Sequence, residues 1–407
     1  MPPSRMSYLD GLRGVMALNV ALSHFMTAFD FAIYTGRPEH AHGSWEVALS
    51  AYPFVFIAAG GNYAVCVFLA LSGFVLAKSF HKSDVSAIAL VVKRTLRLGL
   101  PVLAASLFGW IILSSGFAFN RDAAVFTHST WLSSQFAQQP SLPDALLQAW
   151  NSLLGIPTRE NSYNSVLWTM PIEYIGSLLL IRVFATRLPA SRPRWAAFIM
   201  LALGTMLGRA YISVILFGAA LYLLDAPRFT ARLRWRPAIL VLVLLLGTVP
   251  LSIERWPIWD ALLSITALVP FIPITAPGLT VQADASIWHS ISAVMLVALV
   301  TGWPAAQGLL AKPAVRRLGD MSFPLYLAHI PVLFSVGCFV FLAAHAAGLS
   351  YGTSVLIAFI AYLPSVLLAA MAFERAVDEP SIQLAAGAAK ALAQPAARPV
   401  LPTGHGF

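Results

Sequence analysis

Long apolar stretches separated by short basic loops dominate the pattern of this chain. A further apolar run at 195–225 is broken at Gly208-Arg209, and we interpret it as two short helices that turn there. The stretch 256–277 contains several prolines, which interrupt helices, so it is predicted to be re-entrant or interfacial. Runs long enough to cross the roughly 30 Å hydrocarbon core of a bilayer fall at about 7–30, 52–79, 88–117, 164–186, 237–253, 287–304, 322–346 and 352–377.

The positions of the basic residues orient these spans. Lys and Arg concentrate in the cytoplasmic loops of membrane proteins, and the basic loops require an even number of crossings between them. The sequence therefore predicts ten spans with both termini in the cytoplasm. Residues 1–380 are expected to form one transmembrane domain, and the Ala- and Pro-rich residues 381–407 a disordered cytoplasmic tail. On this map the outer side holds Arg37, Arg121, Arg159, Arg209 and Arg255.

Composition agrees with an all-α, polytopic membrane bundle. Hydrophobic residues make up 58% of the chain and charged residues 11%, whereas soluble domains carry about 25% charged residues. The net charge of +9 belongs to the cytoplasmic loops and does not indicate nucleic-acid binding. Cys66 and Cys338 fall in apolar runs, so we expect no disulfide framework. No cluster of Cys, His and carboxylates has metal-ligand spacing, and no metal is expected.

Two polar groups that are costly in lipid share one face of the first span. His24 follows Arg13 by about three helical turns, or roughly 16 Å along the axis. Ionisable groups at membrane depth normally face a protein interior or a water-filled cavity and mark a site. The alternatives are snorkelling for Arg13 and a hydrogen-bonded core role for His24. Asp10 is placed to hold the Arg13 guanidinium, although a simple surface ion pair fits equally well.

A concentrated positive surface begins the third span. Arg94 and Arg97 lie one turn apart beside Lys93, and such fork-shaped groups suit phosphate or pyrophosphate. Basic residues at a cytoplasmic helix end are also ordinary topology anchors. The spacing alone does not separate these two interpretations.

An intramembrane carboxylate is the third candidate. Glu173 lies two to three turns into the span at 164–186, with Ser165 and Trp168 near its outer mouth. A carboxylate in a membrane needs a partner or must stay neutral, so Glu173 is a candidate for acid–base work or for binding a hydroxyl. The alternative is a structural carboxylate hydrogen-bonded across helices.

Two weaker polar positions complete the candidates. Ser72, in Leu71-Ser72-Gly73-Phe74, marks a close-packing or helix-distorting point. His329 lies about two turns into the span at 322–346, and we expect it to be a structural hydrogen-bonder and not a base. The sequence contains neither a Gly-rich phosphate loop nor a Gly-x-Ser-x-Gly motif.

In combination these motifs resemble the membrane acyltransferase-3 family over about residues 6–380. The region 255–286, long and broken by prolines, departs from the family pattern. The matching motifs, in family order, are Arg13 with His24, Phe68–Leu76, Arg94-x-x-Arg97, Ser165-x-x-Trp168-Thr169-x-x-x-Glu173, Ser322-x-x-Leu325-Tyr326-Leu327-x-His329, and Phe373-Glu374 with Asp378-x-Pro380.

The resemblance implies transfer of an acyl group, most often acetyl, from cytoplasmic acyl-coenzyme A to a carbohydrate hydroxyl across the membrane. Family members modify lipopolysaccharide O-antigen, exopolysaccharide and related sugars. The resemblance therefore implies a multi-pass acyltransferase of the bacterial inner membrane. Its partners would be acyl-coenzyme A, a carbohydrate acceptor and membrane lipids. Acyl-coenzyme A is a substrate, and no permanently bound cofactor is expected. The chain resembles the stand-alone members, which lack a fused hydrolase-like domain.

The family's roles carry over to matching positions. Lys93, Arg94 and Arg97 would bind the nucleotide end of the donor, and Arg13 a phosphate or the pantetheine arm. His24 would act as general base or carry the acyl group transiently. Glu173, entering from the outer side, would orient His24 or the sugar hydroxyl. Supporting roles are expected for Asp10, Ser72, Ser165, Trp168, Tyr326 and His329, with Trp131 and Trp150 as further flat surfaces for a sugar.

Two other classes of function remain open on sequence alone. Intramembrane Arg, His and Glu with broken helices also suit a proton-coupled secondary transporter, although we find no pair of matching halves. A non-catalytic membrane partner of a polysaccharide assembly complex would require His24 to be dispensable. Thioester cleavage or acyl transfer by the purified protein would separate the enzyme from both.

Overall fold

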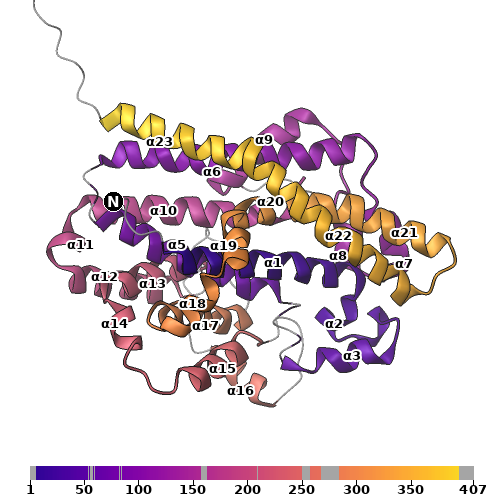
Figure 1. Ribbon diagram of the computed structural model, residues 1–407, viewed down its shortest axis with the longest axis horizontal. Coiled ribbons are helices and arrows are strands. Elements are labelled where there is room, and N and C mark those ends of the chain that lie inside the picture. The colour runs from indigo at the N-terminus through magenta and orange to yellow at the C-terminus, as the bar shows by residue number, and fades with distance from the viewer. Residues whose placement is uncertain are drawn as a thin grey trace, which may run out of the picture.

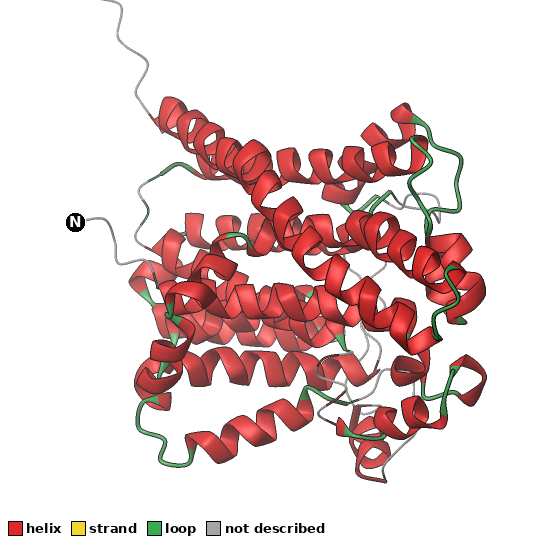
Figure 2. Ribbon diagram, turned by 45° about the vertical axis from the view of Figure 1, so that its right-hand side comes forward, coloured by secondary structure: helices red, strands yellow, loops and turns green. Residues whose placement is uncertain are grey.

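Helices make up the regular structure throughout the described part of the chain, and that part contains no strand (Figures 1 and 2). The computed structural model describes residues 6–53, 55, 58, 60–81, 83, 85–156, 163–208, 210–249, 257–266 and 284–393. The longer helices are α1 (Ser7–Phe29), α5 (Gly61–His81), α6 (Ala87–Ser114), α9 (Leu142–Leu154), α10 (Met170–Ala185), α12 (Pro193–Leu207), α13 (Ile212–Leu223), α15 (Arg236–Leu246), α16 (Pro257–Thr266), α17 (Asp284–Thr301), α20 (Ser322–Val332), α22 (Tyr351–Phe373) and α23 (Glu379–Ala393).

Shorter helices connect the long ones at the two ends of the bundle. The helices α2, α3, α7 and α8 gather at the right-hand end of Figure 1, where α1 ends, and α11 and α14 lie at the opposite end. Their bounds are α2 (Phe31–Thr35), α3 (Ser44–Ser50), α7 (Asn120–Thr127), α8 (Thr130–Ser134), α11 (Leu188–Ser191), α14 (Ala226–Thr230), α18 (Pro304–Leu310), α19 (Pro313–Asp320) and α21 (Cys338–Ala346). Short 3-10 turns form η1 (Pro38–His40) and η2 (Ser165–Thr169), and π-helical turns form η3 (Leu333–Gly337) and η4 (Glu374–Asp378).

The helices are those of a multi-pass membrane protein. Of the described segments, α17 and α18 would add one more span as a pair bent by 97°, while α12, α13 and α15 are shorter and apolar. The helix α1 is less apolar because Asp10, Arg13 and His24 lie on it. The count of ten spans and the cytoplasmic termini remain predictions. Segments both long and apolar enough to cross a membrane are Gly61–His81, Ala87–Ser114, Ser165–Ala185, Ser322–Ala346 and Tyr351–Leu392.

Two of the expected interruptions can be compared with the structure. The run at 195–225 forms two helices, α12 and α13, with a break after Gly208, which confirms the predicted turn; Arg209 lies outside the described residues. The stretch 256–277 contains α16, while residues 267–277 lie outside the described part of the chain. Whether 256–277 is re-entrant therefore stays a prediction.

The expectation of a disordered tail from residue 381 is wrong as far as residue 393. Residues 379–393 form α23, which lies along α6 (Figure 1). Alanine has the highest helix propensity of all residues, and Ala385 and Ala389 are buried. The same composition that suggested disorder therefore builds a helix once α6 offers a surface. Residues 394–407 lie outside the described part of the chain.

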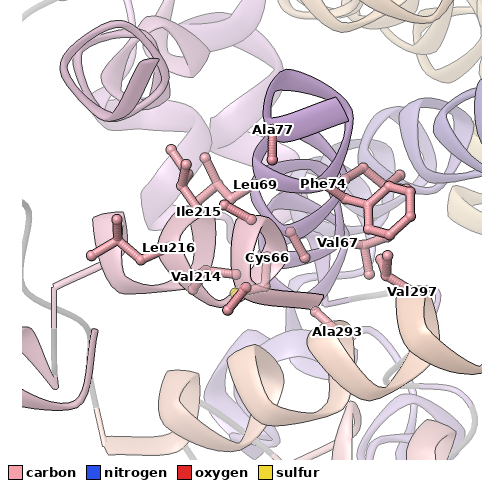
Figure 3. Packing of buried hydrophobic residues seen from close by; sticks show 14 of the residues in the cluster. Cys66, Val67, Leu69, Phe74, Ala77, Val214, Ile215, Leu216, Ala293 and Val297 are labelled. Atoms are coloured by element: carbon pink, nitrogen blue, oxygen red, sulfur yellow. The ribbon is translucent and has the colours of Figure 1, made fainter. Parts of the chain in front are cut away.

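Small residues allow α5 and α13 to approach each other closely. A Cβ atom on Gly73 would lie 2.0 Å from the carbonyl oxygen of Ile215, and one on Gly218 would lie 2.1 Å from that of Ala70. The surrounding apolar side chains of α5, α13 and α17 form one core cluster (Figure 3). The predicted close-packing point at Ser72-Gly73 is thus confirmed, and it fixes α5 as one wall of the interior.

Gly73→Ala should destabilise the protein by about 1–3 kcal/mol, because the added methyl meets backbone that cannot move aside without separating α5 from α13. The measurement is thermal unfolding of the purified protein in detergent. Gly352→Ala is the matched control, since a Cβ atom there has no heavy atom within 4 Å and alanine favours the helix. Equal melting temperatures for the two variants would contradict the close contact.

Candidate active site

Among the described residues, most of the predicted site residues gather around two cavities. The first, of about 400 Å³, is lined at the basic end by Arg13, Arg94, Arg97 and Glu173, and we call it the basic cavity. The second, of about 530 Å³, is lined by His24, Asn62, Trp131 and Trp168, together with residues of α2, and we call it the histidine cavity. Arg13 and His24 thus stand on one helix but line different cavities. Val65 and Tyr326 line both.

Each arginine of the basic cavity has a carboxylate partner. Arg13 Nη1 donates to Asp10 Oδ1 at 3.3 Å, one turn earlier on α1, which is the predicted pair. Arg94 donates to Glu173. Arg97 forms two hydrogen bonds with Asp378, of 2.5 and 3.3 Å. The cavity therefore holds fixed, oriented guanidinium groups whose charge is balanced in the absence of an anion.

Arg94 also carries a donor that has no partner. Its Nε is buried and makes no hydrogen bond with any described residue. A buried donor without a partner costs about 1–3 kcal/mol, so an anion that reached this group would recover that cost. Arg97, by contrast, is further held by the ring of Phe323, 5.3 Å from its guanidinium carbon.

Lys93 is exposed and lines neither cavity. The structure therefore brings Arg94 and Arg97 together with Arg13 but does not join Lys93 to them. Lys93 points away because residues adjacent in a helix project about 100° apart.

Glu173 lies elsewhere than the sequence suggested. It accepts hydrogen bonds from Ser72 and Arg94 in the basic cavity and does not line the histidine cavity, so the expectation that it orients His24 is wrong. The reason is local: Ser165–Thr169 form a 3-10 turn, and α10 starts at Met170, which places Glu173 in the first helical turn facing α6. Its catalytic role stays a prediction.

His24 forms a chain of hydrogen bonds with His329. The Nδ1 of His329 lies 2.7 Å from the carbonyl oxygen of Tyr326, which can only accept, so this nitrogen carries a proton and Nε2 of the neutral ring is an acceptor. The Nδ1 of His24 lies 3.1 Å from that Nε2 and 3.0 Å from the carbonyl oxygen of Val20. It is therefore the protonated nitrogen of His24.

This tautomer leaves the Nε2 of His24 with a free lone pair, which is what a general base requires. The two rings come from α1 and α20, with centroids 5.0 Å apart. His329 is the hydrogen-bonder that the sequence predicted, but its partner is His24, and no sequence signal joins residues so far apart. Hydrogen-bond networks of this kind fix which imidazole nitrogen is available.

Two tryptophan side chains line the histidine cavity together with His24. Trp131 lies with its ring centroid 5.3 Å from that of His24, and α8 is held in place because Ser129 Oγ donates to the carbonyl oxygen of Thr27 at 2.7 Å. Trp168 lines the same cavity, 40% exposed, with its ring against Tyr211. The histidine cavity therefore combines aromatic faces with polar side chains such as Ser23, Thr27 and Asn62, and placed polar groups of this kind orient a small molecule in its site.

Three of the residues given supporting roles by the sequence line neither cavity: His329, which contacts His24, and also Ser165 and Trp150. Ser165 begins the 3-10 turn η2, and Trp150 is 57% exposed on α9. Neither lines the histidine cavity or the basic cavity, so the expectation that Trp150 presents a surface beside Trp131 and Trp168 is wrong.

Asn62 is a polar residue of the histidine cavity that sequence analysis missed. Its amide donates to Ser286 Oγ at 3.1 Å, lies 2.8 Å from His289 Nδ1, and accepts from the Tyr211 hydroxyl. The sequence did contain a signal for this residue, because Asn62 is a polar side chain at the start of the very apolar helix α5. Because α17 and α13 hold this amide, it forms a rigid polar edge of the cavity.

Comparison with known proteins gives one family and several relatives. The family described as an acyltransferase domain matches residues 6–375. Acyltransferase R4 of Phoma sp. is 24% identical over 93% of this chain and 95% of its own length. O-acetyltransferase PaAT-1 of Phomopsis amygdali is 24% identical over 81% of this chain and 73% of its own. The O-acetyl transferase of Shigella phage Sf6 is 32% identical over 41% of this chain and 42% of its own. No solved structure matches.

Proposed function

This chain belongs to the acyltransferase-3 family of membrane acyltransferases, and from that premise we propose that it moves an acetyl group from acyl-coenzyme A to a carbohydrate hydroxyl. The donor enters the basic cavity from the cytoplasm, and the acceptor occupies the histidine cavity on the other side of a bacterial inner membrane. One observation carries this proposal: the basic cavity shares two lining residues with a second cavity, and that second cavity is lined by a histidine whose Nδ1 is engaged by His329 and Val20, so that its Nε2 is the acceptor nitrogen.

The charges of the basic cavity support the donor assignment. Coenzyme A carries a pyrophosphate and a further phosphate, and the planar guanidinium groups of Arg13, Arg94 and Arg97 match phosphate oxygens in charge and geometry. Asp10, Glu173 and Asp378 pair with Arg13, Arg94 and Arg97 in that order and orient the three guanidinium groups. A bound phosphate would also satisfy the unpaired Nε of Arg94.

The histidine cavity supports a direct transfer. The Nε2 of His24 accepts the proton of the acceptor hydroxyl, and the hydroxyl oxygen attacks the thioester carbonyl. The carbon–sulfur bond then breaks, and the departing coenzyme A sulfur takes the proton from His24, which returns to its starting state. His329 keeps the other nitrogen of His24 protonated throughout, so it is a positioning residue.

The acceptor class rests on two observations. Trp131 and Trp168 flank the cavity and offer the flat faces on which a sugar ring packs, while Asn62 offers a fixed polar edge for hydroxyl groups. Relatives described as O-acetyltransferases act on oxygen acceptors. These relatives do not favour the alternative of a proton-coupled transporter.

The test uses membranes from cells that make the chain, with coenzyme A thioester labelled in the acetyl group. We expect label in lipid-linked or polymeric carbohydrate, with a mass increase of about 42 per acetyl group. Label that appears in no carbohydrate fraction, but on a small molecule, would contradict the acceptor assignment. No label anywhere would contradict acetyl transfer itself.

Glu173→Gln should tighten the binding of acetyl-coenzyme A several-fold, because the carboxylate competes with the donor phosphates for Arg94 and repels them. The measurement is calorimetric titration of the purified protein at two salt concentrations, with a smaller effect at high salt, where charges are screened. Asp144→Asn, an exposed carboxylate-to-amide change on α9, is the control. Weaker donor binding would instead show that Glu173 is needed to orient Arg94.

A further inference from the structure

The basic cavity and the histidine cavity meet at two side chains. Among the residues that line each cavity, Val65 of α5 and Tyr326 of α20 are common to both. Val65 is 6% exposed and so is Tyr326, so both fill the wall between the cavities. If the donor enters beside Arg94 and reacts at His24, its thioester must pass this wall.

The ring of Tyr326 is held across the wall from both ends. Its hydroxyl donates to the carbonyl oxygen of Val166 at 3.0 Å and lies 2.9 Å from Thr169 Oγ1. At the other end, its own carbonyl oxygen accepts from His329 Nδ1. The edge of the ring faces Phe68, with the centroids 5.9 Å apart. These contacts give the ring a defined position.

Val65 forms the opposite edge and is equally constrained. A β-branched side chain on a helix has one strongly preferred rotamer, so its two methyl groups project in a fixed direction. The backbone beneath them is fixed as well, because Gly73 and Gly218 bring α5 into contact with α13. The wall between the cavities therefore contains two stiff side chains, Val65 and Tyr326.

We propose that Val65 and Tyr326 form a bottleneck that the acyl group must cross, and that its width selects unbranched acyl groups. This inference rests on the proposed function. The acyl group lies at the tip of the donor, and the pantetheine arm follows it. The arm next to the thioester is an unbranched chain, so a passage wide enough for the arm is also wide enough for a straight acyl group. A branched or ring-bearing acyl group is wider than the arm and must displace Tyr326 or Val65.

The bottleneck therefore separates acyl groups by width and not by length. Acetyl, propionyl and butyryl groups share one cross-section, whereas isobutyryl carries an additional methyl at the branch. One methyl or methylene group in a fitted apolar site changes discrimination by about 10–200-fold. Removing the two methyl groups of Val65 should relax that discrimination.

The experiment compares two labelled donors, acetyl-coenzyme A and isobutyryl-coenzyme A, in membranes that contain the natural acceptor. The quantity measured is the ratio of isobutyryl to acetyl incorporation that depends on His24. We expect Val65→Ala to raise this ratio at least tenfold. Tyr326→Phe, which keeps the ring but removes its hydroxyl bonds, should raise the ratio to a smaller extent. Butyryl relative to acetyl incorporation should change little in either variant.

Val67→Ala is the matched control, because Val67 is a buried valine of α5 in the same core cluster as Val65 but lines neither cavity (Figure 3). An unchanged isobutyryl ratio in Val65→Ala, with acetyl transfer intact in the wild type, overturns the bottleneck and leaves the proposed function standing. An equal rise in Val67→Ala also overturns it, since general loosening would then explain the effect. If acetyl transfer in wild-type membranes does not depend on His24, both the proposed function and the bottleneck are overturned.

Discussion

His24→Ala is expected to lower acyl transfer by about 10²- to 10⁴-fold, the usual contribution of a positioned general base. The loss should fall on the rate of transfer and not on donor affinity, because His24 and the paired arginines line different cavities. The measurements are incorporation of labelled acetyl groups by membranes and binding of acetyl-coenzyme A by the purified variant.

The fold should survive this change. His24 makes hydrogen bonds with Val20 and His329 at the edge of a cavity, and an alanine there leaves space that water can fill. His345→Ala is the control, since His345 lies on α21 and lines neither cavity. Transfer near the wild-type rate in His24→Ala would show that this histidine is not the base.

Replacing Arg94 and Arg97 together with alanine is expected to weaken acetyl-coenzyme A binding by 10²-fold or more. Hydrogen bonds to charged groups contribute about 1.5–3 kcal/mol each, and both guanidinium groups line the basic cavity. Titration of the purified protein measures the effect, which should shrink as salt is added. Arg228→Ala is the control, because its side chain is 85% exposed at the protein surface.

The double change also leaves two carboxylates without their partners, and an unpaired buried charge destabilises a protein. A second variant removes this ambiguity: Arg94→Gln combined with Glu173→Gln keeps the site neutral and hydrogen-bonded. If this neutral variant is folded and still binds the donor as tightly as the wild type, Arg94 anchors the helix and Glu173 and does not bind phosphate.

The sequence predicted the positions of the site residues within single helices better than it predicted the contacts between helices. Helical periodicity placed Arg13 and His24 on one face, and the structure shows that this face crosses two cavities. The pairing of Arg13 with Asp10 followed from spacing within one helix. The hydrogen bonds that His24 donates to His329 and Arg97 donates to Asp378 join distant segments, and a single sequence carries no signal for them.

The misplaced Glu173 shows a second limit. Its direction depends on where α10 begins, and the 3-10 turn at Ser165–Thr169 rotates every later residue relative to a continuous helix. Helix boundaries are the least certain part of any sequence-based prediction. A shift of one residue turns a side chain by about 100°, which is enough to move it from one cavity to the other.

The contact between Arg97 and Asp378 bears on how this protein should be truncated or fused. The family match ends at residue 375, three residues before the partner of Arg97, and Ser381 at the start of α23 also lies within 3.4 Å of that guanidinium. A chain cut at the family boundary would lose both groups and the helix that packs along α6. A tag or a fused protein at the C-terminal side should therefore be joined after Ala393, where α23 ends.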